Sequence, residues 1–396
     1  MFEKITIRES ANSEKDFPLD MGLILESMLF YRKTIVLCNS WISLKQLFNT
    51  FGIDNINKLI DSETLEILFS ESLSGISTNK NQAGIELHNL VIVSSPQHTL
   101  DINLKKICTE ITGREGRGRR IANSFEGKIK KFNFDAGFVT NAKSIFSDEG
   151  YINKSVQLLL KNWIPELENE KIENFKVEQV ENGFIVNSKL DFNSLNKIYN
   201  KSRINKENIL TPAYLLTNIF DVETDLFHAS NNLSEIVSTT QKSMLIEVRL
   251  KYLTDKYLKS AEKKENFIKY ISPSFNTIRD EFNQGKIDIN SIIESILHSN
   301  KFKKWLENID NNEDLLQEYL KEISKDNLIN KMPNKIYRWG FFTLGGLFLE
   351  ASFPTGIGTI SGVALSFLDS FLFEKLAIGW QPNQFVNQYL IKNLKD

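Results

Sequence analysis

Residues 338–380 read RWGFFTLGGLFLEASFPTGIGTISGVALSFLDSFLFEKLAIGW, and they form the most apolar stretch of the chain. A first apolar run, 340–349, ends at Glu350, and a second run, 356–373, contains a single charge, Asp369. Pro354, Thr355 and Gly356 interrupt the two runs, as turn residues do. The pattern predicts two short apolar helices joined as a hairpin.

Small residues recur at every fourth position of the second run, so on a helix they share one face and allow close helix packing. The first run is too short to span a bilayer, and acidic side chains within the hairpin would be costly in lipid. We therefore expect the hairpin to lie in the core of a helical domain, with membrane contact as the less favoured alternative. The predicted packing residues are Gly358, Gly362, Ser366, Ser370 and Asp369.

Length and charge set limits on the rest of the chain. A chain of 396 residues predicts two to three domains. The formal net charge of −2 gives no general attraction to nucleic acid or anionic lipid, so such binding must be local. The N-terminus shows no signal-peptide pattern, and Cys38 and Cys108 are predicted to be buried free thiols in a reducing cytoplasm. The high Asn, Lys and Ile content indicates an AT-rich bacterial genome.

The first 190 residues alternate between strand and helix signals. The hydrophobic pattern and the end signals predict a buried strand at 34–38 and a helix at 41–51 that ends at Gly52. A hairpin is predicted at 175–187. Further strands are expected at 3–8, 64–70 and 85–93, with a polar loop between the last two, and further helices at 19–31, 54–61, 99–112, 141–146 and 151–163.

After about residue 191 the strand signals end. Helices are predicted at 191–200, 212–229, 232–263, 289–303 and 383–394, among others. The predicted fold is an α+β N-terminal domain followed by a mostly α-helical domain that ends in an apolar helical hairpin. The predicted domains cover residues 1–190, residues 191–337, and residues 338–396, where the hairpin and a C-terminal helix pack into the helical domain.

The most distinctive polar segment lies between Gly113 and Lys131. It contains seven cationic and two acidic residues, a local charge of about +5 in a nearly neutral protein. Glycines would let a loop backbone approach an anion, and arginine forks match phosphate oxygens. The spacing is neither a P-loop nor a dinucleotide fingerprint, and a solvated surface loop is the alternative interpretation. The predicted anion-binding residues are Arg114, Arg117, Arg119, Arg120, Lys128, Lys130 and Lys131.

Other polar patterns are weak. Asp221, Asp225 and His228 share one helix face, and such a cluster can bind a metal ion, but the apolar stripe of that helix lies on another side. We therefore expect these three residues to face solvent and to be inert, and we predict no metal and no cofactor. Ser94 or Ser95 beside His98 is too local to indicate a catalytic triad.

Three functions compete. The favoured hypothesis is a non-enzymatic bacterial binding or sensing protein that engages nucleic acid or another phosphate-rich ligand through the basic segment. It also allows for a protein partner or a homo-oligomer. The alternatives are a membrane-active effector whose hairpin enters a bilayer, and an enzyme that acts on nucleic acid or nucleotides. A basic segment together with a stored apolar hairpin would suit an antiviral defence protein.

Overall fold

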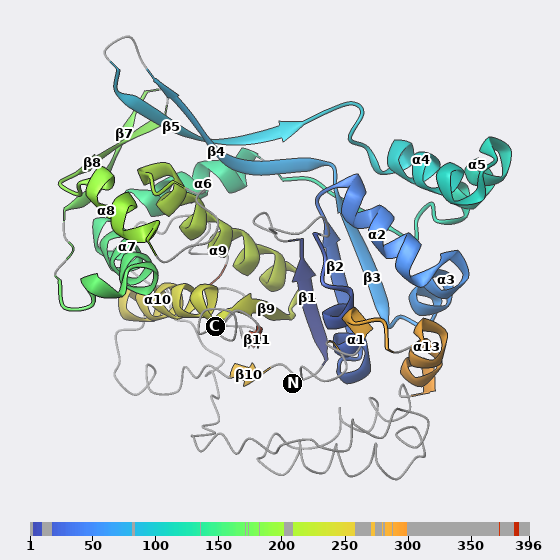
Figure 1. The fold of residues 1–396 in the computed structure, drawn as a ribbon. Helices are drawn as coiled ribbons and strands as arrows, with labels where there is room; N and C mark the ends of the chain where they lie inside the picture. Colours follow the sequence, from blue (N-terminus) through green and yellow to red (C-terminus); the bar gives the residue numbers. More distant parts are fainter. Residues whose placement is uncertain are drawn as a thin grey trace.

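The computed structural model describes residues 3–9, 18–80, 84–134, 136–170, 172, 174–181, 183–201, 209–257, 271–273, 279, 282–286, 288–298, 372 and 384–387. These residues form helices and two β-sheets, and the N-terminal region is α/β (Figure 1). The expected mixture of helices and strands in the first part of the chain is therefore confirmed.

The larger sheet is parallel throughout its described strands. In chain order these are β1 (Lys4–Arg8), β2 (Lys33–Cys38), β3 (Leu65–Ser70), β6 (Lys130–Phe132), β9 (Glu235–Thr239), β10 (Ile271–Pro273) and β11 (Gln384–Asn387). Their order in space is β10-β11-β9-β1-β2-β3-β6. The chain therefore runs from β1 toward β2 on one side and later returns to place β9 on the other side of β1.

Helices cover this sheet because its central strands are apolar on both faces, as parallel strands require. In β2, Val36 and Cys38 belong to a large core, whereas Ile35 and Leu37 face the opposite side with Phe132 packed beside them. The helices that contribute to the large core are α1 (Met21–Phe30), α2 (Trp41–Phe51), α3 (Ile53–Asp61), α4 (Leu100–Thr112), α5 (Glu115–Ser124) and α13 (Ile289–His298).

The ends of these helices follow their sequence signals. Asp20 caps α1 by accepting from the N–H of Leu23, and Ser40 caps α2 by accepting from the N–H of Ser43. Gly52 closes α2, as its position after the last apolar residue predicts. Local signals of this kind placed the first four helices correctly.

Strand β9 corrects the prediction of an uninterrupted helix at 232–263. Leu233 adopts a left-handed conformation with φ of 49°, which ends α9 (Pro212–Asn232), and β9 begins two residues later. Helix α10 (Thr240–Tyr257) then follows directly. The five residues of β9, EIVST, do not alternate between apolar and polar side chains, so they give no signal with a period of two. The expected loss of β-structure after residue 191 is therefore wrong.

Strand β11 corrects a second helix prediction, at 383–394. Its four residues pair in parallel with β9, and the first three also pair in parallel with β10. Val386, for example, is opposite Ser238 of β9. The remaining residues of that predicted helix lie outside the described part of the chain.

The smaller sheet is antiparallel and holds β4 (Ser72–Lys80), β5 (Glu86–Ser94), β7 (Phe175–Val180) and β8 (Gly183–Ser188) in the order β4-β5-β8-β7. The hairpin predicted at 175–187 is confirmed. The polar loop expected before residue 85 is wrong, because β4 pairs with β5 from Ser72 to Lys80. The sequence SLSGISTNK contains only two strongly apolar residues, so composition concealed this strand.

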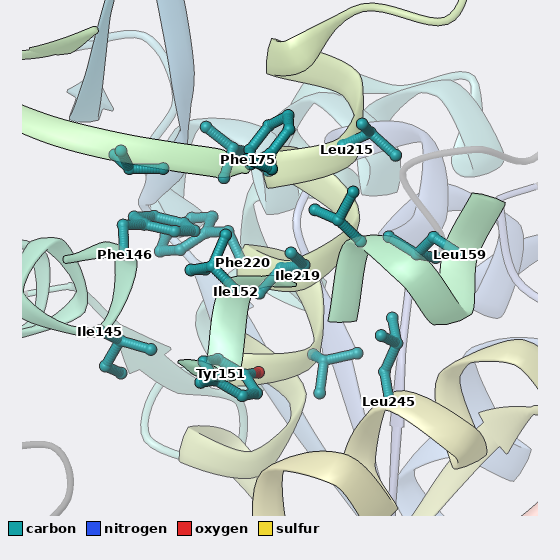
Figure 2. Packing of buried hydrophobic residues seen from close by; sticks show 14 of the residues in the cluster. Ile145, Phe146, Tyr151, Ile152, Leu159, Phe175, Leu215, Ile219, Phe220 and Leu245 are labelled. Carbon is teal, nitrogen blue, oxygen red and sulfur yellow. The ribbon is translucent and has the colours of Figure 1, made fainter. Parts of the chain in front are cut away.

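A second core lies between the smaller sheet and the helices α6 (Ala136–Phe146), α7 (Glu149–Trp163), α8 (Phe192–Tyr199), α9 and α10. A short 3-10 helix, η1 (Pro165–Leu167), follows α7 and adds Leu167. Figure 2 shows side chains of α6, α7, α9 and β7 meeting in this core, among them Phe146, Ile152, Phe175 and Phe220. These contacts tie segments that lie far apart in the sequence.

The apolar stretch 338–380 lies outside the described residues except for Leu372, which is fully buried in the second core. The hairpin, its small-residue stripe and the division into three domains thus stay predictions. Among the described residues, no helix is both long enough and apolar enough to cross a membrane.

Gly183 gives a test of the smaller sheet. Its φ of 146° and its position against His88 leave no room for a side chain, since an added Cβ would overlap the carbonyl oxygen of His88. Gly183→Ala should therefore lower the free energy of unfolding by about 1–3 kcal/mol, as overpacking does. Gly75 in β4 is the matched control, because an added Cβ there meets nothing within 4 Å. Urea denaturation measures the free energy of unfolding of both variants. A larger loss for Gly75→Ala than for Gly183→Ala would contradict this account.

Candidate polyanion-binding surface

The segment predicted as a basic loop is mostly helical, which corrects the sequence interpretation. Helix α4 ends at Gly113, whose N–H donates to the carbonyl of Thr109 (2.9 Å), and α5 begins at Glu115. Glu115 precedes Arg119 by four residues, a spacing that favours a helix. The glycines suggested a loop because they are poor helix formers, but packing against α4 overrides that preference.

Gly118 fixes how α5 sits on α4. A Cβ atom at Gly118 would lie 2.6 Å from the backbone nitrogen of Thr109, so only glycine permits this approach. Gly118 and Ala122 are the buried residues of α5. Figure 1 shows the two helices side by side at one end of the molecule, with α5 outermost. Apart from Ile121, which is partly buried against the large core, the other side chains of α5 lie on the surface.

The four arginines of this segment are all exposed. Arg119 donates to Glu115 at 2.8 Å, and so exposed an ion pair contributes little to stability. Arg114, Arg117 and Arg120 form no ion pair with any described residue. These three guanidinium groups are therefore available to an external anion.

The three lysines of the predicted set have acidic neighbours. Lys128 is 2.7 Å from Asp61, and Lys130 is 2.7 Å from Glu66. Lys131 is 2.8 Å from Asp101, and the interaction raises the pKa of this lysine. The local positive charge counted along the sequence is therefore reduced in three dimensions, and the unbalanced charge lies on α5 and on Arg114, the residue that precedes it. Whether any of these residues binds an anion stays a prediction.

The expectation that Asp221, Asp225 and His228 face solvent is wrong. Asp225 is 6% exposed and accepts from Arg8 Nε at 2.6 Å and from Lys242 Nζ at 2.9 Å. Asp221 also pairs with Arg8 and lies 2.5 Å from Lys242 Nζ. The sequence argument missed these ion pairs because the partners lie in other elements of the chain. Arg8 is at the end of β1, and Lys242 is in the first turn of α10.

The charges of this cluster balance one another. Burial alone would raise the pKa of Asp221, but Arg8 and Lys242 outweigh that effect and hold the pKa well below its usual range. Burial would lower the pKa of Lys242, and the two aspartates raise it instead. Arg8, Asp221 and Lys242 are therefore ionised near neutral pH. With Asp225, they join the carboxyl end of the larger sheet to α9 and α10.

His228 lies beside this cluster among aromatic rings. Its ring centroid is 4.6 Å from that of Phe132 and 5.4 Å from that of Phe134. Burial, with a smaller effect of the positive charge on Arg8, lowers the pKa of His228 to about 3. Its Nε2 atom makes no hydrogen bond with the described residues. The imidazole is therefore neutral and packs as an aromatic ring.

A second charged cluster lies within the second core. Arg249 and Glu223 are essentially unexposed and lie 2.7 Å apart, and Tyr151 donates to the same Glu223 oxygen at 3.0 Å. The guanidinium of Arg249 also lies 5.2 Å from the centre of the Tyr151 ring. These contacts link α7, α9 and α10. The sequence offered no signal for them beyond the presence of charges within apolar helices.

The candidate metal-ligating and catalytic side chains of the sequence can be located among the described residues. No group of three or more metal-ligating side chains occurs among the described residues. His98 Nε2 lies 3.0 Å from the carbonyl oxygen of Ser70, so this ring nitrogen contacts the backbone and not the hydroxyl of Ser94 or Ser95. Both Cys38 and Cys108 are buried free thiols whose pKa is raised by burial.

Removing Asp225 should destabilise the fold. Asp225→Ala leaves Arg8 and Lys242 with one carboxylate between them, and breaking a buried ion pair costs about 3–5 kcal/mol. We expect a loss of about 3 kcal/mol, because Asp221 still offsets part of the charge. Glu126→Ala, at an exposed carboxylate, should change stability by less than about 0.5 kcal/mol. Equal melting temperatures for the two variants would show that the cluster is unimportant.

His228 predicts a dependence of stability on pH. The unfolded chain takes up a proton on this histidine below about pH 6.5, whereas the folded chain does so only near pH 3. The free energy of unfolding should therefore fall by up to about 1.4 kcal/mol per pH unit as the pH drops through this window. His228→Phe should reduce that slope in urea denaturation between about pH 6.5 and 5, which is above the range where aspartates titrate. Burial also lowers the pKa of His88, so part of the slope should remain, but an unchanged slope would contradict the assignment.

Comparison with known proteins adds no assignment. No family model, curated protein or solved structure matches the chain.

Proposed function

We propose that this protein binds a polyanionic partner, a nucleic acid or another phosphate-rich ligand, through the outer face of α5, and that it acts as a binding protein. The observation that supports the proposal is the set of exposed arginines at Arg114, Arg117 and Arg120, none of which pairs with a described carboxylate. Arginine presents planar donor pairs that match phosphate oxygens. A surface of this kind attracts anions even on a protein with a net charge of −2.

The α4–α5 packing supports binding rather than a role in stability. Arg117 and Arg120 are three residues apart on the side of α5 opposite Gly118, so their side chains emerge from one helix face. The tight contact at Gly118 holds that face in place, which reduces the ordering needed when a ligand binds. An arginine that mainly stabilised the fold would have a carboxylate or an aromatic ring beside it. Arg249 has both.

Neighbouring cations extend the surface. Lys105 and Lys106 are exposed on α4, the helix on which α5 packs. Helices α4 and α5 together form the α4–α5 hairpin, and both helices carry positive charge. Glu110 and Glu115 offset part of that charge. A ligand that follows the hairpin would exchange its counterions for these side chains, so binding should weaken steeply with salt.

Replacing the unpaired arginines tests the proposal. Arg117→Ala combined with Arg120→Ala should weaken binding of labelled oligonucleotides and heparin. It should also reduce the slope of log affinity against log salt by about 1.4 for single strands or about 1.8 for duplex DNA. Fluorescence anisotropy at several salt concentrations measures both effects. Fold stability should change by less than about 0.5 kcal/mol per site, because both side chains are exposed.

The matched control removes two positive charges that are already balanced. Lys128→Ala combined with Lys130→Ala changes the net charge by the same amount, but these lysines pair with Asp61 and Glu66. This control should retain most of the affinity. Equal losses in the two double variants would mean that net charge alone governs binding. A wild-type protein without affinity for any of these polyanions at low salt would overturn the proposal.

A further inference from the structure

Trp41 is an aromatic side chain on the surface next to the α4–α5 hairpin. It is the first residue of α2, directly after the N-cap Ser40, and its side chain is partly exposed. Glu9 holds this turn by accepting from the N–H of Asn39 and from the hydroxyl of Ser40, both at 2.7 Å. The ring therefore projects from a fixed backbone rather than from a loose loop.

Two lysines from different helices lie over this ring. Lys106 Nζ of α4 is 4.0 Å from the ring centroid, and Lys45 Nζ of α2 is 5.2 Å from it. Lys45 also pairs with Glu110 at 2.6 Å, whereas Lys106 forms no ion pair with a described residue. An aromatic ring with ammonium groups beside it is the combination that single-stranded nucleic acids bind, the ring for bases and the charges for phosphates.

The ring lies beside α4, the helix on which the arginine-bearing α5 packs. Lys106 precedes Thr109 by three residues of α4, about one helical turn, and Thr109 is the residue on which Gly118 of α5 packs. Ile102 lies one turn in the other direction on α4 and is 48% exposed, and Ile42 beside Trp41 is 47% exposed. Exposed apolar side chains on α2 and α4 therefore accompany the Trp41 ring and the cations of α4.

We propose that Trp41 is a stacking platform for an unpaired nucleobase, so that the polyanion bound by this surface is a single-stranded nucleic acid. This inference rests on the proposed function and names the class of ligand. Stacking of one base on an aromatic ring is worth about 5- to 150-fold in affinity. An exposed cation–π contact is worth only about 2- to 5-fold. A base can therefore displace Lys106 from the ring. The ammonium of Lys106 then pairs with a phosphate of the same strand.

The base must be unpaired for this contact. In a duplex the faces of the bases are stacked on one another, so a surface tryptophan cannot reach them. A sulfated polysaccharide offers dense negative charge but no aromatic face. The three ligands therefore share the electrostatic part of binding and differ in the stacking part, which allows the two contributions to be separated.

The test compares a thymidine oligonucleotide, a blunt-ended DNA duplex and heparin by anisotropy with the full chain. Trp41→Leu should weaken binding of the oligonucleotide by about 5- to 150-fold and change binding of the duplex and heparin by less than about 2-fold. Trp41→Phe should fall between Leu and the wild type, because it keeps a smaller ring. Both variants should keep the wild-type salt slope, because no phosphate contact is lost.

Tryptophan fluorescence gives a second measurement that does not depend on the leucine variant folding. The chain has five tryptophans, so the signal of Trp41 is the difference between the wild type and Trp41→Phe. Saturating oligonucleotide should quench this difference, and heparin should not.

The outcomes separate the two proposals. Loss of binding to the oligonucleotide alone, together with quenching of Trp41, supports the stacking role. Equal losses for all three ligands, no quenching, or a wild type that binds duplex as tightly as single strands would each overturn it. The last of these leaves the polyanion proposal intact. Failure of the wild type to bind any of the ligands would overturn the proposed function itself.

Discussion

The guanidinium of Arg8 lies at the carboxyl end of β1 with only 12% of its side chain exposed, and it needs negative charge close by. Removing such a group from water costs several kcal/mol unless partners offset the loss. Both partners, Asp221 and Asp225, come from α9, more than 200 residues later in the chain. The contact of α9 with the larger sheet is therefore coupled to the burial of Arg8. Helix α9 also contributes to the second core, so the same helix takes part in both the ion pairs and that core.

Lys242 completes this arrangement at an unfavourable place for a cation. It lies in the first turn of α10, where the helix dipole disfavours positive charge. The carboxylates of Asp221 and Asp225 are within 2.9 Å of its ammonium and more than offset that effect. One set of charges thus connects β1, α9 and α10, and no two of these three elements are consecutive in the sequence.

The sequence revealed most of what is local and little of what is distant. Gly52 and Ser40 marked the ends of α2 because capping depends on adjacent residues. Strands β4 and β9 were missed because each is stabilised by its neighbours in the sheet rather than by its own composition. The exposed arginines of α5 were identified, but their helix and the carboxylates that balance Lys128 and Lys130 were not. Trp41 could not be linked to the basic segment, since only folding brings Lys106 over its ring.

The place of β9 in the larger sheet has a consequence for how the protein is made. β1 has β2 on one side, but its other side stays an open edge until β9 forms, about 230 residues later. A ribosome adds about 5–20 residues per second, so this edge is unpaired for roughly 10–45 s during synthesis. Open strand edges pair readily with other chains, and an apolar strand such as Ile5-Thr6-Ile7 is a favourable template. The first strand is therefore the part of this chain most exposed to pairing with other chains while its middle is still being made.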